Sequence, residues 1–329
     1  MKSVKAKNIF AMSLVVFLFA LPDGIRASSL ESNEQALYEE GMALNELRRF
    51  DEALLRFKEA VRTDLETHKY HNAIFLTYIS TRRGLKGLKY YEELAAEHPE
   101  SSTVHYWLGR FYLQRGSLDQ SAEAFEASAR LRPDDEHPWI SLGHVRARMG
   151  QDAEALAAYR EADRLIPGIP VVMAGIGKVY FNRKEYAQAR EAYEKAIEKD
   201  PGLMEARFEL SLIYERDGEF SKAIHEWKKI LENDPNDLRA REKLADIYFK
   251  GEQYGDAVRE YSLLSKLLPN DPKVYLALGE SQVMLAATVG SSEGRAQLLA
   301  GAAESFQHAL DFDPENESAK AYLDRLKKP

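Results

Sequence analysis

The sequence contains no cysteine. Without a thiol, the chain has no disulfide bonds, thiolate zinc sites, iron–sulfur clusters or cysteine nucleophiles. It has only 12 prolines and 19 glycines among 329 residues, too few for a collagen-like or low-complexity chain. Basic residues are fewer than acidic ones, and the resulting net charge of −8 argues against a general nucleic-acid-binding protein.

Long apolar runs are missing too, with one exception near the N-terminus. A basic start (Lys2, Lys5 and Lys7) precedes an apolar stretch from Ile9 to Leu21. A basic region, an apolar core and the small residues that follow are typical of a secretory signal peptide. About 13 helical residues span only about 20 Å, short of the roughly 30 Å core of a bilayer. The pattern therefore favours a cleaved signal over a transmembrane anchor.

We predict that residues 1–27 form this signal peptide and that cleavage follows Ala27 or Ser29. The expected destination is the periplasm, with the extracellular space as the alternative. No later stretch approaches about 18 apolar residues, so we expect no transmembrane segment after cleavage.

The rest of the chain is built on a period of 34 residues. Prolines that are expected to end helices recur at this spacing: Pro99, Pro133, Pro167, Pro201, Pro235 and Pro269. Aromatic residues keep the same spacing: Phe57, Tyr91, Phe125, Tyr159, Tyr193, Trp227 and Tyr261. A small residue stands four positions before each of these aromatic residues.

Within one period, apolar and small residues recur at helical spacing, so each repeat is predicted to form two amphipathic helices. Glycine at the eighth position, as in Gly109 and Gly143, allows the second helix to approach closely. The aromatic residue of the second helix fills the volume beside it. No single repeat buries its apolar face alone, so neighbouring repeats must stack.

This pattern resembles the tetratricopeptide repeat family. The fourth repeat matches best, with Trp139, Leu142, Gly143, Ala155, Tyr159 and Pro167. The resemblance implies an all-α fold, a right-handed α-solenoid of about eight antiparallel helix pairs that ends in a capping helix. Together with the signal-peptide pattern, it indicates an exported bacterial member of the family.

The predicted organisation is a short linker at 28–33, a repeat array at 34–316 and a capping helix at 317–329. The eight repeats are 34–67, 68–101, 102–135, 136–169, 170–203, 204–237, 238–271 and 272–316. The eighth repeat is longer than the others. Its extra residues near 283–301 form either a flexible loop or an extension of both helices.

No catalytic constellation stands out, so we predict a protein with no enzymatic activity, no cofactor and no bound metal. The sequence has no HExxH, no phosphate-binding glycine loop and no GxSxG. His68 and His71 are three residues apart on a predicted helix and could share a metal, but no third ligand accompanies them. His71 stands at the fourth position of its repeat, as Trp139 and Tyr275 do, which favours a buried histidine.

The resemblance also implies which residues line the concave surface of the array. In this family the first helix of each repeat contributes its positions 2, 5, 9, 12 and 13. Carried over residue by residue, they predict a ligand-binding groove with a ladder of basic residues and aromatic side chains beside it. Its residues are Tyr106, Arg110, Gln114, His144, Arg148, Lys178, Phe181, Asn182, Phe208 and Arg216.

We therefore predict a protein–protein interaction scaffold of the cell envelope. Its groove would bind an extended protein or peptide segment, acidic in character, through charge-assisted hydrogen bonds. The alternative is an accessory module that binds an anionic polysaccharide during export of the polymer. Neither function involves a nucleic acid.

Overall fold

The computed structural model describes residues 23–327, with side chains from residue 33 onward. Residues 1–22, most of the predicted signal peptide, lie outside the described residues. Within the described range every regular element is an α-helix, which confirms the all-α fold. None of these helices has the length and apolarity that crossing a membrane requires.

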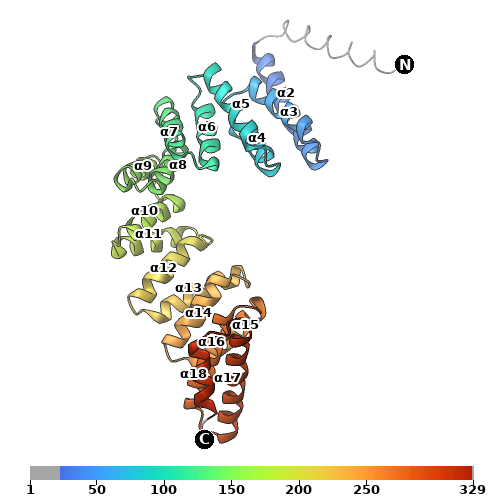
Figure 1. Cartoon of the computed structure of the whole chain (residues 1–329). Helices are drawn as coiled ribbons and strands as arrows, with labels where there is room; N and C mark the ends of the chain where they lie inside the picture. The colour runs from blue at the N-terminus through green and yellow to red at the C-terminus, as the bar shows by residue number, and fades with distance from the viewer. Residues whose placement is uncertain (1–22, 328–329) are drawn as a thin grey trace, which may run out of the picture. The chain divides into compact units, whose positions relative to one another are not determined.

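Consecutive helices pack as pairs joined by short turns, one pair for each predicted repeat (Figure 1). The helices are α2 (Asp23–Glu46), α3 (Phe50–Thr63), α4 (His68–Ser80), α5 (Gly84–Glu97), α6 (Ser102–Arg115), α7 (Leu118–Leu131), α8 (Glu136–Arg148), α9 (Asp152–Leu165), α10 (Pro170–Asn182), α11 (Tyr186–Lys199), α12 (Met204–Arg216), α13 (Phe220–Asn233), α14 (Leu238–Lys250), α15 (Tyr254–Leu267), α16 (Pro272–Thr288), α17 (Ser292–Phe312) and α18 (Glu317–Leu326). The even-numbered helices from α2 to α16 are the first helices of the repeats. The stacked pairs form the predicted α-solenoid.

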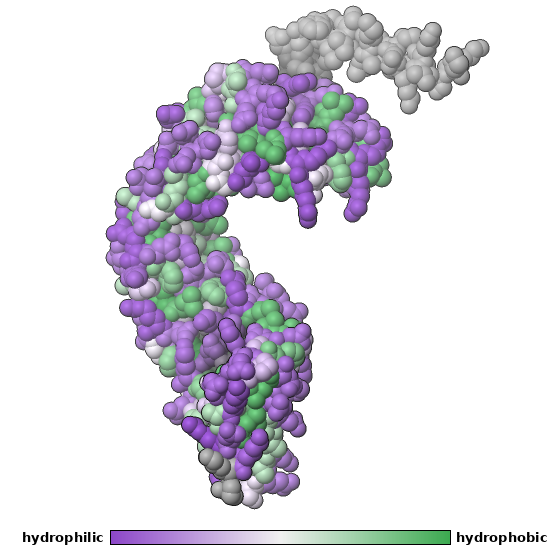
Figure 2. Space-filling model, in the orientation of Figure 1, coloured by the Kyte–Doolittle hydropathy of each residue, from purple (hydrophilic) through white to green (hydrophobic). Residues whose placement is uncertain are grey.

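The contacts divide the chain between Pro167 and Gly168 into two compact units, called below the N-terminal unit and the C-terminal unit. On the face seen in Figure 2, hydrophobic side chains of each unit form separate patches among hydrophilic ones. This face therefore offers no continuous apolar surface in either unit.

Five of the helix pairs close on a contact between a glycine of the first helix and an aromatic ring of the second. A Cβ atom at Gly143 would lie 2.6 Å from the ring of Tyr159, which is almost fully buried. Glycine is required here because the ring occupies the space that a side chain would need. In the second repeat Phe75 replaces this glycine, and Gly87 of the second helix makes room for Phe111 of the next repeat.

The turn inside seven helix pairs passes through one residue in the left-handed conformation. These residues are Arg48, Arg82, Gly116, Gly150, Lys184, Gly218 and Glu252, with φ between 57° and 79°. Glycine adopts this conformation without strain, whereas other residues are destabilised there by about 1 kcal/mol. Four of these turns therefore carry strain that glycine would remove.

A hydrogen bond joins the first helix of six repeats to the turn before it. The side chain at the fourth position donates to the backbone carbonyl six residues earlier, for example from Arg207 Nε to Pro201 at 3.0 Å. The same contact is made by His71, His105, Trp139, Arg241 and Tyr275. These residue types share a donor, which explains why one position accepts such different side chains.

The structure differs from one detail of the predicted organisation and decides between two alternatives for another. Residues 28–33, expected as a linker, belong to α2, because neither proline nor glycine interrupts the chain between Gly24 and Gly41. The extra residues of the eighth repeat lengthen both of its helices, to 17 residues in α16 and 21 in α17. At the end of the chain α18 packs against α17, in the place of the predicted capping helix.

Candidate functional site

The first helices follow one another along one face of the N-terminal unit, since α2 contacts α4 and α4 contacts α6. The rings of His68 on α4 and His137 on α8 stack with centroids 6.0 Å apart, although a complete repeat separates their helices. Neighbouring packed helices lie about 10 Å apart. Side chains two repeats apart therefore meet only because this face is concave.

Glu66, in the turn before α4, joins the starts of three first helices. Its carboxylate accepts hydrogen bonds from the hydroxyls of Ser101 at 2.7 Å and Thr103 at 2.9 Å, and it forms an ion pair with Arg132 before α8. Partial burial alone would raise the pKa of Glu66. The hydroxyl donors and the Arg132 charge outweigh burial and hold the pKa below its usual range. These contacts fix one edge of the concave face.

The two stacked histidines have different protonation behaviour. The indole N–H of Trp107 donates to Nδ1 of His68 at 3.2 Å, while Nδ1 of His137 donates to Asp135 at 2.9 Å. Desolvation lowers the pKa of His68, and the hydrogen bond to Asp135 raises the pKa of His137. A single proton on the pair therefore resides on His137, since both neighbours favour it there.

Arg110 of α6, the first residue of the predicted basic ladder, rests on aromatic rings. Its guanidinium carbon lies 4.8 Å from the ring centroid of Phe75 and 5.0 Å from that of Trp107. Its Nη1 is 3.5 Å from the hydroxyl of Tyr106, whose ring also contacts both stacked histidines. Among the described residues, no carboxylate forms an ion pair with Arg110. Among the residues that the structure describes, this half-buried cation on the concave face is thus left without a carboxylate partner.

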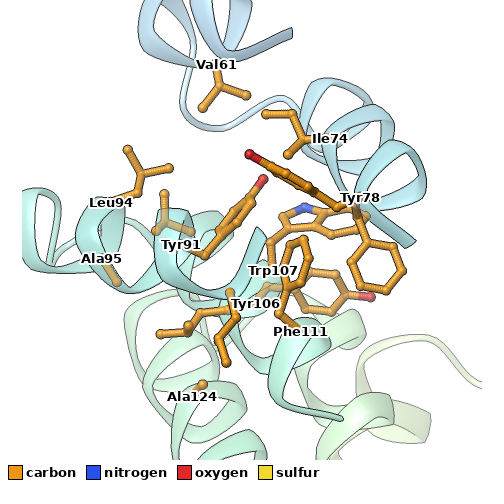
Figure 3. Packing of buried hydrophobic residues seen from close by; sticks show 14 of the residues in the cluster. Val61, Ile74, Tyr78, Tyr91, Leu94, Ala95, Tyr106, Trp107, Phe111 and Ala124 are labelled. Carbon is orange, nitrogen blue, oxygen red and sulfur yellow. The ribbon is translucent and has the colours of Figure 1, made fainter. Parts of the chain in front are cut away.

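Tyr106 itself is buried, with 8% of its surface exposed. Its ring lies 5.2 Å from His68 and 5.6 Å from Phe125. Figure 3 shows Tyr106, Trp107 and Phe111 gathered with the aromatic side chains of α4 and α5. We expected Tyr106 to add open aromatic surface to the groove, but it forms the floor of the concave face, because curvature brings its neighbours over it.

The other predicted residues of the N-terminal unit lie at its surface. Gln114, His144 and Arg148 are exposed, and Arg148 has no ion-pair partner among the described residues. The ring of His144 stands edge-on to Tyr159 with centroids 5.6 Å apart, and desolvation lowers its pKa. His144 is therefore neutral at pH 7, which leaves Arg110 and Arg148 as the charged members of the ladder in this unit.

In the C-terminal unit the basic ladder is neutralised by the protein itself. Lys178 forms an ion pair with Glu209, a buried carboxylate on α12. Arg216 pairs with Asp217 at 2.7 Å. These two cations are therefore less available to an external anion than Arg110.

The predicted aromatic residues of the C-terminal unit are half-buried. Phe181 packs edge-on against Tyr186 with centroids 5.6 Å apart, and Phe208 packs in the same way against Trp227 at 4.8 Å. Asn182, between them in the predicted groove, is exposed. The aromatic rings mainly complete the packing inside each helix pair.

His71 is a buried histidine, as its repeat position indicated. The hydroxyl of Tyr91 lies 2.7 Å from its Nδ1, and its Nε2 donates to the carbonyl of Leu65 at 2.9 Å. Burial lowers the pKa of His71 to about 4. Both ring nitrogens are used, so His68 and His71 do not form a metal-binding pair. Asp135, which accepts the hydrogen bond from His137 described above, is also the N-cap residue of α8.

The predicted ligand-binding residues leave out four members of the concave face. Glu66, Arg132 and Trp107 stand in turns or at positions that the family pattern does not assign to the groove. His137 stands at position 2 of its repeat, which the pattern does assign to the groove, but it was left out of the predicted ligand-binding residues. One usable signal was spacing. Glu66 and Arg132 carry opposite charges and are 66 residues apart, close to two periods.

A concave face of stacked helix pairs, with an unpaired cation on it, defines a helical-repeat interaction scaffold. Sequence models described as tetratricopeptide repeat match residues 72–136, 137–168, 175–237 and 214–280. The chain therefore belongs to the tetratricopeptide repeat family. Such repeats form protein–protein interaction scaffolds and are generally without catalytic activity.

Known proteins support the same fold. The Cell division cycle protein 27 homolog A of Arabidopsis thaliana is 37% identical over 95 residues, which are 28% of this chain and only 13% of that protein. Among solved structures, the C-terminal part of a TPR repeat-containing protein from Cytophaga hutchinsonii has a TM-score of 0.60 at 19% identity, covering 78% of this chain and 99% of that one.

A second solved structure is YrrB, described as a TPR protein with an unusual peptide-binding site. It has a TM-score of 0.52 at 19% identity and covers 61% of this chain and 97% of that one. At such identities these similarities concern the fold alone. The polysaccharide alternative finds no support among these relatives.

Proposed function

We propose that this protein is a scaffold of the cell envelope that binds an extended segment of a partner protein on the concave face of its first helices. The observation that carries the proposal is Arg110, a cation on that face that is held by aromatic rings and lacks a carboxylate among the described residues. A partly desolvated charge is stabilised by a ligand carboxylate, through a charge-assisted hydrogen bond. Arg148, exposed and likewise unpaired, adds a second positive charge from α8.

A photoreactive amino acid at Gln114 tests the binding face, because Gln114 is exposed on the same helix as Arg110. The control carries the same amino acid at Glu123, which is exposed on the second helix of that repeat. After irradiation in the source organism, crosslinks are mapped by mass spectrometry. The proposal expects one defined segment of a partner to react with Gln114 and not with Glu123. Equal reaction from both positions would refute it.

Export is tested by the N-terminal sequence of the protein recovered from the envelope fraction. The signal-peptide pattern predicts a start at Ser28 or Leu30. Recovery of the chain from the cytoplasm with residues 1–27 intact would contradict export. It would leave the binding proposal untouched, because the concave face lies entirely beyond these residues.

A further inference from the structure

Three first helices of the N-terminal unit place successive residues at one repeat position. Met42 on α2, Leu76 on α4 and Arg110 on α6 are each 34 residues apart. Met42 and Leu76 are apolar, yet 38% and 55% of their surfaces are exposed. Leu76 directly follows Phe75, whose ring supports the Arg110 guanidinium at 4.8 Å. Two exposed apolar side chains thus lead to one unpaired cation.

Building on the proposed function, we propose that the N-terminal unit recognises a peptide motif of two aliphatic residues and one carboxylate, with two residues between consecutive members. Packed first helices lie about 10 Å apart, and a peptide in the extended polyproline II conformation advances about 3.1 Å per residue with three residues per turn, so every third side chain lies on the same face. Each step from one helix to the next therefore takes three peptide residues. The aliphatic side chains cover Met42 and Leu76, and the carboxylate binds Arg110.

Arg110 is suited to this role because the protein fixes its orientation before a ligand arrives. The rings of Phe75 and Trp107 lie near its guanidinium, and the hydroxyl of Tyr106 is within 3.5 Å of Nη1. A guanidinium held in this way loses little further freedom on binding and can engage both carboxylate oxygens. The cations of the C-terminal unit differ, since Lys178 already has its carboxylate in Glu209. Charge complementarity therefore selects the N-terminal unit.

The probe is a fluorescein-labelled peptide with blocked ends and the core Leu-Ser-Thr-Leu-Ser-Thr-Glu, together with the reversed core, Glu-Ser-Thr-Leu-Ser-Thr-Leu. Two comparison peptides replace the glutamate by lysine or both leucines by serine. Fluorescence anisotropy measures their affinity for the purified protein. The proposal expects one chain direction to bind, and both comparison peptides to bind at least tenfold more weakly.

Matched variants separate the site from general effects of charge and apolar surface. Arg110→Gln should weaken peptide binding at least tenfold. Arg110→Lys keeps the charge but cannot contact both carboxylate oxygens at once, so its affinity should lie between those of the wild type and Arg110→Gln. Arg130→Gln removes the same charge from the exposed side of α7 and should change nothing. Leu76→Ser should weaken binding several-fold. Leu55→Ser, on α3 and 52% exposed, is its control.

Several results would overturn the proposal. Equal binding of the lysine peptide, or undiminished binding to Arg110→Gln in a variant with unchanged helicity, would exclude the carboxylate contact. Polyglutamate that competes as well as the leucine peptide would identify a simple polyanion surface. If Gln114 crosslinks to a partner but neither peptide binds, the motif is wrong and the proposed function stands. If both experiments fail, both are wrong.

Discussion

Replacing Gly143 with alanine places a methyl group against the ring of Tyr159. The new Cβ would lie 2.6 Å from two ring carbons, and the ring has almost no exposed surface into which it could move. Overpacking of this kind costs about 1–3 kcal/mol. Alanine recovers about 1 kcal/mol through its higher helix propensity. A separation of 2.6 Å is far inside van der Waals contact, so the overpacking cost lies at the upper end of that range, and we expect Gly143→Ala to destabilise the N-terminal unit by about 2 kcal/mol net.

The assay is thermal unfolding followed by circular dichroism. For a unit of this size, each kcal/mol lowers Tm by about 2–4 °C, so the expected fall is about 4–8 °C. Gly255→Ala is the control, since a Cβ there meets nothing closer than 4.0 Å, from Leu285. That variant should be neutral or slightly stabilised. The opposite signs distinguish a local clash from a general effect of glycine replacement.

A double variant tests whether the clash with the Tyr159 ring causes this loss of stability. Tyr159→Leu alone opens a cavity and is destabilising. Combined with Gly143→Ala, it should cost less than the sum of the two single changes, because the smaller side chain accommodates the methyl group. Additive losses, or an unchanged Tm for Gly143→Ala, would refute the argument that the ring requires glycine at this position.

Three further changes test other parts of the fold. Lys184→Gly removes strain at φ 62°, and urea denaturation should show a net gain of about 0.5 kcal/mol, whereas a loss would contradict the strain argument. His71→Gln tests pH dependence: because burial lowers the pKa of His71 to about 4, its stabilisation is complete above about pH 6.5 and declines towards pH 4, by at most about 3 kcal/mol. The stability difference between wild type and His71→Gln should shrink over that range, and a constant difference would count against it. Arg207→Met removes one partner of a buried ion pair and leaves the Glu226 carboxylate unpaired, which should lower the free energy of unfolding by about 3 kcal/mol. Adding Glu226→Leu in a double variant should restore most of that loss.

The sequence predicted features that depend on contacts within one repeat. Gly143 and Tyr159 belong to rows that recur every 34 residues, so their meeting follows from the period alone. Burial of Tyr106 follows instead from curvature, which brings His68 and His137 to it from two other repeats. The period contains no information on that curvature, so the sequence placed Tyr106 in the right helix but on an open surface.

The basic ladder shows a second limit. The sequence identified Lys178 and Arg110 as members of one series, yet only Lys178 has a carboxylate beside it. Its partner, Glu209, stands at a position that the groove pattern leaves out. Whether a cation is available to a ligand depends on such neighbouring side chains, and these differ from repeat to repeat.

Glu66 has a consequence for how the N-terminal unit unfolds. In most helical-repeat proteins each repeat contacts only its neighbours, so an array can fray one repeat at a time from its ends. Glu66 and Arg132, like His68 and His137, connect repeats that are not neighbours. Opening α4 therefore loosens α8 as well, and α4, α6 and α8 should exchange their amide hydrogens as one cooperative block. Fraying that starts at α2 would stop at that block.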